Sequence, residues 1–183
     1  MTYLLVACGV VLTGVFATSA ASKLRGRAAF AEFVTATARI GGFRPDQARP
    51  MAMVVAGAEA AIVLGFITAA LAASRVLAGL ATAGSALLLA VFTGAIVRAM
   101  RRGAAVPCRC FGASKTPLGR RHLVRNAVLL VAAALGLATA LAAGSASVHP
   151  AGLAVAAGAG VLVAILAIAT DEIADLFAYT ARP

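Results

Sequence analysis

Two cysteines separated by one residue are the most chemically informative feature of the sequence. They lie in the stretch Pro107-Cys108-Arg109-Cys110-Phe111-Gly112, inside a polar segment that glycine and proline interrupt. In an extended chain, residues i and i+2 come within disulfide range, which requires Cα atoms about 4.4–6.8 Å apart. A ring this small is strained, and strain raises the reduction potential of a disulfide. The spacing therefore predicts a redox-active pair rather than a structural cross-link.

Basic residues surround this pair. Arg109 lies between Cys108 and Cys110, and Lys115, Arg120 and Arg121 follow. Nearby positive charge favours the reactive thiolate over the thiol. Two alternatives remain open: the thiols could be isolated residues without a chemical role, or they could be soft ligands for a metal such as Cu(I).

The remaining cysteine and the two histidines are weaker candidates for chemistry. His122 could assist a soft metal, but zinc is disfavoured because the cysteine segment supplies at most three of its four ligands. We expect both His122 and His149 to be interfacial rather than catalytic. Cys8 lies near the start of the first apolar stretch, remote from Cys108 and Cys110. We expect it to be buried and inert, as free cysteines usually are.

Glu59 is the only charged residue in the apolar stretch 51–73. At about 1.5 Å per helical residue it lies about 13 Å from the start of that stretch. A carboxylate at that depth must face the interior of a bundle, stay protonated or find a partner, and Lys23, Ser19 and Thr18 are candidate partners. Two roles are open: a proton relay or polar handle for a quinone or thiol site, or a structural hydrogen bond between helices.

The composition indicates an integral membrane protein. Of 183 residues, 62% are hydrophobic and 12% are charged, against about 45–50% and about 25% in soluble domains. This excludes both a soluble globular protein and a disordered chain. The net charge of +10 does not indicate nucleic-acid binding, because the charges fall in two short blocks with few aromatic residues nearby. Three cysteines cannot form a fully paired disulfide framework, which excludes a disulfide-rich secreted mini-protein.

Five stretches approach or reach the roughly 20 apolar residues that cross a bilayer. We therefore expect an all-α, polytopic helical bundle that forms one transmembrane domain over residues 1–170. A short polar tail at 171–183 is expected to fray into solvent. The first stretch could also be a cleaved signal peptide, but it lacks the basic residues that precede one. The expected spans are residues 2–21, 51–73, 76–97, 127–143 and 151–169.

Two basic connectors, residues 23–50 and 98–126, separate these spans. In the first, Ala28–Ile40 has the periodicity of a short amphipathic helix at the interface. Gly41-Gly42 should end this helix, and Pro45 and Pro50 should keep the next stretch irregular. The face expected to be buried carries Phe30, Phe33, Val34 and Thr37, with Glu32 and Arg39 away from it.

The basic residues also predict an orientation in the cell membrane. Fourteen of the sixteen Lys and Arg residues flank or fill the two connectors. The positive-inside rule then puts both connectors in the cytoplasm and the N-terminus outside. The runs Arg101-Arg102 and Arg120-Arg121 are expected to contact anionic lipid headgroups.

Four short motifs together resemble one known family. Ser19-Ala-Ala-Ser-Lys23-Leu24 is similar to a Ser-x-x-x-Lys-Leu signature, and Cys108–Gly112 is similar to a Cys-Gly-Cys-Phe-Gly loop. Arg125-Asn126 matches an Arg-Asn pair that opens the next helix, and Glu59 matches a glutamate in the second span. Over roughly residues 10–140 the chain therefore resembles the MauE-like (methylamine utilisation) membrane proteins of the DoxX-like superfamily. Arg109 departs from the family pattern, which usually has glycine there, and so restricts the tight turn of a Cys-x-Cys bridge.

The resemblance implies a redox-associated role in the maturation of methylamine dehydrogenase, whose small subunit carries many disulfides. Cys108 and Cys110 would exchange disulfides with a thioredoxin-like or client protein. The supporting polar site would comprise Glu59, Lys23, Ser19, Arg109, Arg125 and Asn126.

Other readings of the same resemblance stay open. The helical layout is distantly similar to the vitamin K epoxide reductase bundle, which passes electrons to a quinone, although a quinone has no motif of its own here. The alternatives are a non-enzymatic subunit of a larger membrane complex, or soft-metal handling through the cysteine pair. The disulfide role also conflicts with the charge count, because exported proteins acquire disulfides outside whereas the basic connector is predicted inside.

Overall fold

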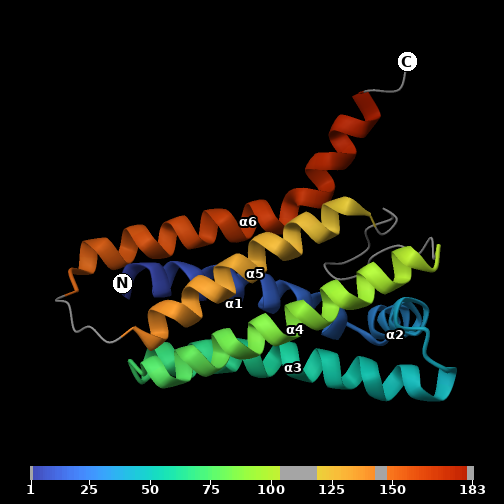
Figure 1. Ribbon diagram of the computed structural model, residues 1–183, viewed down its shortest axis with the longest axis horizontal. Helices are drawn as coiled ribbons and strands as arrows, with labels where there is room; N and C mark the ends of the chain where they lie inside the picture. Colours follow the sequence, from blue (N-terminus) through green and yellow to red (C-terminus); the bar gives the residue numbers. More distant parts are fainter. Residues whose placement is uncertain (1, 104–118, 143–147, 181–183) are drawn as a thin grey trace.

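The chain is a bundle of α-helices, five of them long and apolar enough to cross a membrane (Figure 1). The computed structural model describes residues 2–103, 119–142 and 148–180, with side chains up to residue 169. The expected all-α class, with five spans and one short helix, is confirmed, and the chain is a multi-pass membrane protein. The helices are α1 (Thr2–Leu24), α2 (Arg27–Gly41), α3 (Pro45–Leu71), α4 (Arg75–Arg101), α5 (Arg120–Leu141) and α6 (Pro150–Thr180).

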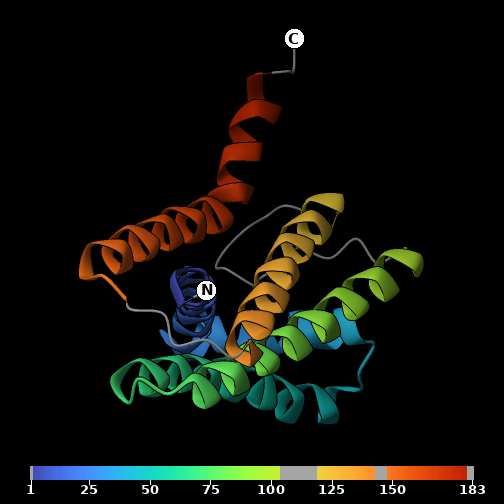
Figure 2. The same cartoon turned by 60° about the vertical axis from the view of Figure 1, so that its left-hand side comes forward.

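Helix α1 is the centre of the bundle and contacts every other helix (Figures 1 and 2). It is hydrophobic on all sides, which is the pattern of a helix enclosed by others. The short helix α2 packs against α1, α3 and α4, whereas α6 packs against α1 and α5. Side chains on α1 are therefore placed to meet groups from any other helix.

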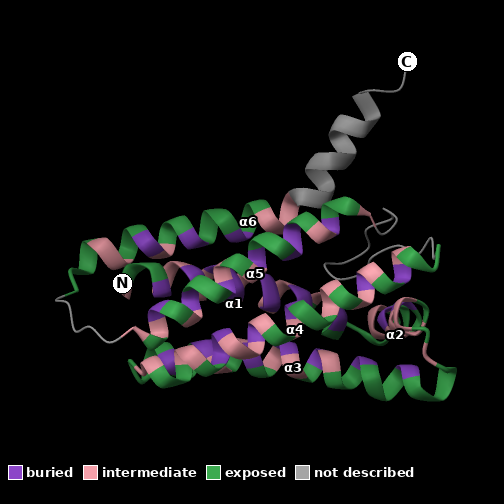
Figure 3. Cartoon of the chain, in the orientation of Figure 1, coloured by how far each residue is buried: buried purple, intermediate pink, exposed green. Residues whose placement is uncertain are grey.

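Apolar side chains fill the interior and also cover the outside (Figure 3). Leu12 and Phe16 of α1 contact a core to which α3, α4 and α5 each contribute. Large apolar residues such as Leu80 and Val155 are exposed on the outer faces. In a bilayer these outer residues face lipid, so the outer faces need no polar layer.

All five spanning helices extend beyond the expected spans at the end that carries the basic connectors. Helix α4 continues to Arg101, and α5 begins at Arg120 rather than at residue 127. Basic side chains in the last turn of α4 interact favourably with its helix dipole, so charge does not end that helix.

The irregular stretch expected from Pro45 to Pro50 is wrong, because both prolines lie within α3. Pro45 occupies the first position of the helix, where a missing N–H costs nothing. Pro50 lies in the second turn and removes only the backbone bond to the carbonyl of Asp46. A frayed tail was expected from residue 171 onward, but the backbone of α6 stays helical through Thr180.

The amphipathic helix expected in the first connector is confirmed as α2. Phe33 is buried, whereas Glu32 and Arg39 are exposed. Gly42 ends the helix with φ 69°, and its N–H donates to the carbonyl of Ala38. This left-handed conformation favours glycine, which explains the Gly-Gly signal at the helix end.

Helices α1 and α6 approach closely through small residues. A Cβ on Gly160 would lie 2.8 Å from the carbonyl oxygen of Ala7 and 2.9 Å from Cβ of Val10. A Cβ on Gly14 would lie 3.0 Å from Cβ of Ala164. Close packing of this kind stabilises helix pairs in membranes through van der Waals contacts, because the hydrophobic effect does not drive helices together in lipid.

Gly160→Ala is therefore expected to destabilise the bundle, by about 1–3 kcal/mol as overpacked cores do. Gly158→Ala is the matched control, since a Cβ at Gly158 meets nothing within 4 Å. Denaturant unfolding in detergent micelles measures both. Equal midpoints for the two variants would contradict the close approach of α1 and α6.

Candidate functional site

A buried ion pair joins α1 to α3. Nζ of Lys23 donates to both carboxylate oxygens of Glu59, at 2.6 and 2.7 Å. The hydroxyl of Ser19 donates to Oε1 of Glu59 at 3.0 Å and accepts from Lys23 at 2.7 Å. The three side chains are almost fully enclosed, with exposures of 2% for Lys23, 0% for Glu59 and 3% for Ser19. We call these three residues the ion cluster.

The helical spacing on α1 explains why the ion cluster forms. Ser19 and Lys23 are four residues apart, so they lie on the same face of the helix. Side chains on a helix tilt toward its N-terminus, so Lys23, near the C-terminal end of α1, reaches back into the bundle. Glu59 meets it from the middle of α3.

Helix α2 covers the ion cluster with an aromatic ring. Nζ of Lys23 lies 4.7 Å from the ring centroid of Phe33, which is a cation–π distance. Phe30 packs beside it, with ring centroids 6.4 Å apart. The short helix therefore shields the ammonium group from the basic end of the bundle.

The ion cluster balances its charge locally. Moving a single charge out of water costs several kcal/mol, and the mutual attraction of a pair offsets this cost only with good geometry and further hydrogen bonds. Here the carboxylate of Glu59 accepts three hydrogen bonds, two from Lys23 and one from Ser19. The arrangement has the geometry of a hydrogen-bonded ion pair inside an apolar bundle.

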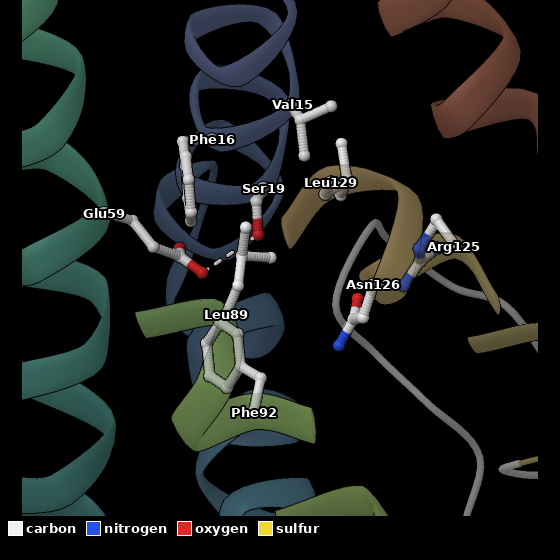
Figure 4. Close-up of a pocket in the computed structure, with 9 residues that line it drawn as sticks. All are labelled: Val15, Phe16, Ser19, Glu59, Leu89, Phe92, Arg125, Asn126 and Leu129. Atoms are coloured by element: carbon white, nitrogen blue, oxygen red, sulfur yellow. Dashed lines mark hydrogen bonds between the residues drawn. The ribbon is translucent and has the colours of Figure 1, made fainter. Parts of the chain in front are cut away.

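A small cavity lies beside the ion cluster, among α1, α3, α4 and α5 (Figure 4). Its volume is about 20 Å³, which is room for about one water molecule. Ser19 and Glu59 line one side, and Arg125 and Asn126 of α5 line another (Figure 4). These four polar residues line the space together with the apolar side chains of Val15, Phe16, Leu89, Phe92 and Leu129.

Two further side chains extend the polar interior on α4 and α5. Nδ2 of Asn126 donates to Oγ1 of Thr93 at 3.4 Å. His122 is buried on α5 with 2% exposure, and Arg125 and Asn126 are each 5% exposed. His122, Arg125, Asn126 and Leu129 follow the i, i+3, i+4, i+7 spacing of one helix face.

That spacing adds to the expectation for His122, which was to be interfacial: the residue lies in the first turn of α5 and is buried. Helix α5 begins at Arg120, so His122 is already on its inward face. Hydropathy alone missed this because charged residues precede the apolar run, whereas the i, i+3, i+4, i+7 pattern was present in the sequence.

The other sequence candidates fall into three groups. Of the candidate partners of Glu59, Lys23 and Ser19 contact it, whereas Thr18 instead donates to the carbonyl of Gly14 in its own helix. Cys8 is a buried free thiol, as expected. His149 is exposed, and its backbone N–H donates to the hydroxyl of Tyr3.

The cysteine pair lies outside the described residues. Cys108, Arg109 and Cys110 belong to the segment that joins Gly103 to Gly119, between α4 and α5. Within the part of the chain that the structure describes, no group of three or more His, Cys, Asp or Glu side chains could hold a metal ion.

Comparison with known proteins gives one match. A family model described as "Methylamine utilisation protein MauE" matches residues 1–139. The match covers α1 to α4 and nearly all of α5, and it leaves α6 outside. No curated protein and no solved structure matches the chain.

The ion cluster predicts a strong energetic coupling between Lys23 and Glu59. Lys23→Met or Glu59→Gln alone leaves one buried charge without its partner, and each is expected to cost about 3–5 kcal/mol of unfolding free energy. The double variant Lys23→Met/Glu59→Gln removes both charges and should recover most of that loss. Unfolding of all four proteins in the same detergent measures the coupling.

The exposed pair Arg44–Asp46, 3.5 Å apart, supplies the control. Arg44→Gln should change the unfolding free energy by about 0–1 kcal/mol, because surface pairs contribute little. If the losses from the two single variants simply add in the double variant, Lys23 and Glu59 are not coupled.

Proposed function

The chain belongs to the MauE family, and from this premise we propose that it serves methylamine utilisation by exchanging disulfides with a partner protein in the cell membrane. Cys108 and Cys110 are the proposed exchanging thiols. The partner would be a thioredoxin-like protein or a client such as a methylamine dehydrogenase subunit. Support comes from the family match, the membrane bundle and the Cys-x-Cys spacing.

The proposed exchange is balanced without a further reactant. One cysteine thiolate attacks a disulfide of the partner, forming a mixed disulfide and releasing one partner thiolate. The second cysteine then attacks the mixed disulfide and releases the other partner thiolate. Cys108 and Cys110 end as a disulfide, and two electrons have passed to the partner. The reverse sequence oxidises a dithiol of the partner.

A role for the helical bundle in this exchange is supported by the cavity that Glu59 shares with α5. Glu59 lines it with Arg125 and Asn126, which lie in the first two turns of α5. The cysteine segment leads directly into this helix. In the exchange the protons of one dithiol pass to the thiolates of the other, and in this proposal the carboxylate of Glu59 relays one of them. Arg125 contributes a positive charge on the same cavity.

Trapping the thiols tests the exchange itself. In a Cys8→Ser chain, membranes equilibrated at a series of redox potentials and then alkylated should show Cys108 and Cys110 converting together between dithiol and disulfide. A Cys110→Ser variant should accumulate a mixed disulfide with the partner, because the second thiol that resolves it is missing. If both cysteines are alkylated at every potential, so that neither a disulfide nor a mixed disulfide ever forms, the proposal is excluded.

The same two thiols report the orientation of the protein. We propose that the basic connectors face the cytoplasm, on the basis of the charge distribution. A membrane-impermeant thiol reagent should then label Cys108 and Cys110 in opened vesicles but not in intact cells. Labelling in intact cells would place the pair outside.

The double variant Lys23→Met/Glu59→Gln tests the proton role in a bundle that keeps its packing. We expect it to stay folded and to slow disulfide exchange by about a hundredfold, the lower end of the range for a general acid or base. Exchange rates are measured by stopped alkylation across pH, with the Arg44→Gln protein as control. An unchanged rate and pH profile in the folded double variant would assign the ion cluster a structural role alone.

A further inference from the structure

Helix α4 carries an open groove near its C-terminal end. The groove has a volume of about 660 Å³ and is lined by Thr93, Gly94, Val97, Arg98, Arg101 and Arg102. These residues fall at intervals of three and four, so they form one stripe along the last turns of α4. We call this feature the α4 groove.

The α4 groove changes character along its length. Its inner part consists of Thr93, Gly94 and Val97, and a Cβ at Gly94 would meet nothing within 4 Å. Its outer part carries the exposed side chains of Arg98, Arg101 and Arg102. None of the described residues that line it is acidic. An apolar floor with a cationic mouth matches a molecule that has an apolar chain and an anionic head.

The position of the α4 groove within the bundle fits the same molecule. It lies at the end of α4 where the two basic connectors meet the bundle (Figure 1). From Gly94 to Arg102 the helix rises about 12 Å, at about 1.5 Å per residue. Gly94 therefore lies deeper in the span than the arginines, which is the order that an acyl chain and its headgroup have in a bilayer.

One arginine of the mouth also has a structural contact. The guanidinium of Arg102 donates to the carbonyl of Ile40, at the C-terminal end of α2. This contact fixes one edge of the mouth and joins α4 to α2. Arg98 and Arg101 are the two remaining cations of the groove, one turn apart on the same helix face.

We propose that the α4 groove binds an anionic phospholipid, with its phosphate on Arg98 and Arg101 and its acyl chain over Gly94 and Val97. Guanidinium groups bind phosphate oxygens through paired hydrogen bonds. A headgroup with a net negative charge is favoured over a zwitterionic one, because the arginines repel the ammonium of phosphatidylcholine. This site differs from a diffuse attraction to the membrane surface because it needs both the charge and the open floor.

Two variants of the full-length protein separate these requirements. Arg98→Gln/Arg101→Gln removes charge and keeps shape, whereas Gly94→Leu fills the floor and keeps charge. Arg25→Gln/Arg27→Gln is the charge control, since both residues are exposed, Arg25 between α1 and α2 and Arg27 at the start of α2. Gly57→Leu is the shape control, because a Cβ at Gly57 meets nothing within 4 Å.

Binding of fluorescent phosphatidylglycerol is measured in phosphatidylcholine nanodiscs, with native mass spectrometry counting retained lipids. The arginine variant should lose about tenfold or more in affinity, as expected for two cations near a lipid headgroup. Gly94→Leu should also weaken binding, whereas both controls should match the unchanged protein.

Three outcomes would overturn the proposal. Equal loss in both arginine pairs would indicate diffuse electrostatic attraction, and equal retention of phosphatidylcholine would indicate a site without charge selectivity. Competition by inorganic phosphate, together with unaltered binding by Gly94→Leu, would indicate a free-phosphate site instead. A variant that loses its unfolding transition is replaced by Arg101→Lys, which keeps charge but loses paired hydrogen bonding and should bind with intermediate affinity.

Discussion

The requirement to pair Lys23 with Glu59 inside an apolar bundle constrains the rest of the structure. A lone charge in lipid is so costly that the two side chains must meet, and their meeting fixes how α1 lies against α3. The length of the lysine side chain sets how far from the end of α1 the carboxylate can lie. Ser19 and Phe33 then complete the surroundings of the pair, and through Phe33 the position of α2 also depends on it.

The polar interior continues from that pair toward α5, and its continuity is what makes the region a candidate for chemistry. Apolar packing alone would not place Arg125 and Asn126 on the same small cavity as Glu59. Asn126 also donates a hydrogen bond to Thr93, and Thr93 in turn lines the α4 groove. The proposed disulfide exchange and the proposed lipid site rest on different residues, although both lie at the end of the bundle where the cysteine segment joins α4 to α5.

Much of this architecture could be predicted because bilayer thickness and charge patterning are strong constraints. The spans, the amphipathic helix α2 and the partners of Glu59 all followed from apolar length, periodicity and the cost of a buried carboxylate. The helix ends could not be predicted in this way. The length of an apolar stretch predicts only the part of a helix that lies in lipid, whereas the helix itself continues as long as its backbone hydrogen bonds do. Because of Pro45, Pro50 and the charges before Ala127, the predicted spans therefore began too late. Thr18 was a poorer partner than Ser19 because its hydroxyl bonds to its own helix.

Helix α1 presents opposite faces to α3 and α6. At about 100° per residue, Ala7, Val10 and Gly14 lie roughly half a turn from Ser19 and Lys23. The contacts with α6 and the ion cluster thus use separate surfaces of one helix, and α6 lies beyond the part of the chain that matches the family. The consequence is that side chains on the α6-facing side of α1 can change without altering the immediate surroundings of Lys23 and Glu59.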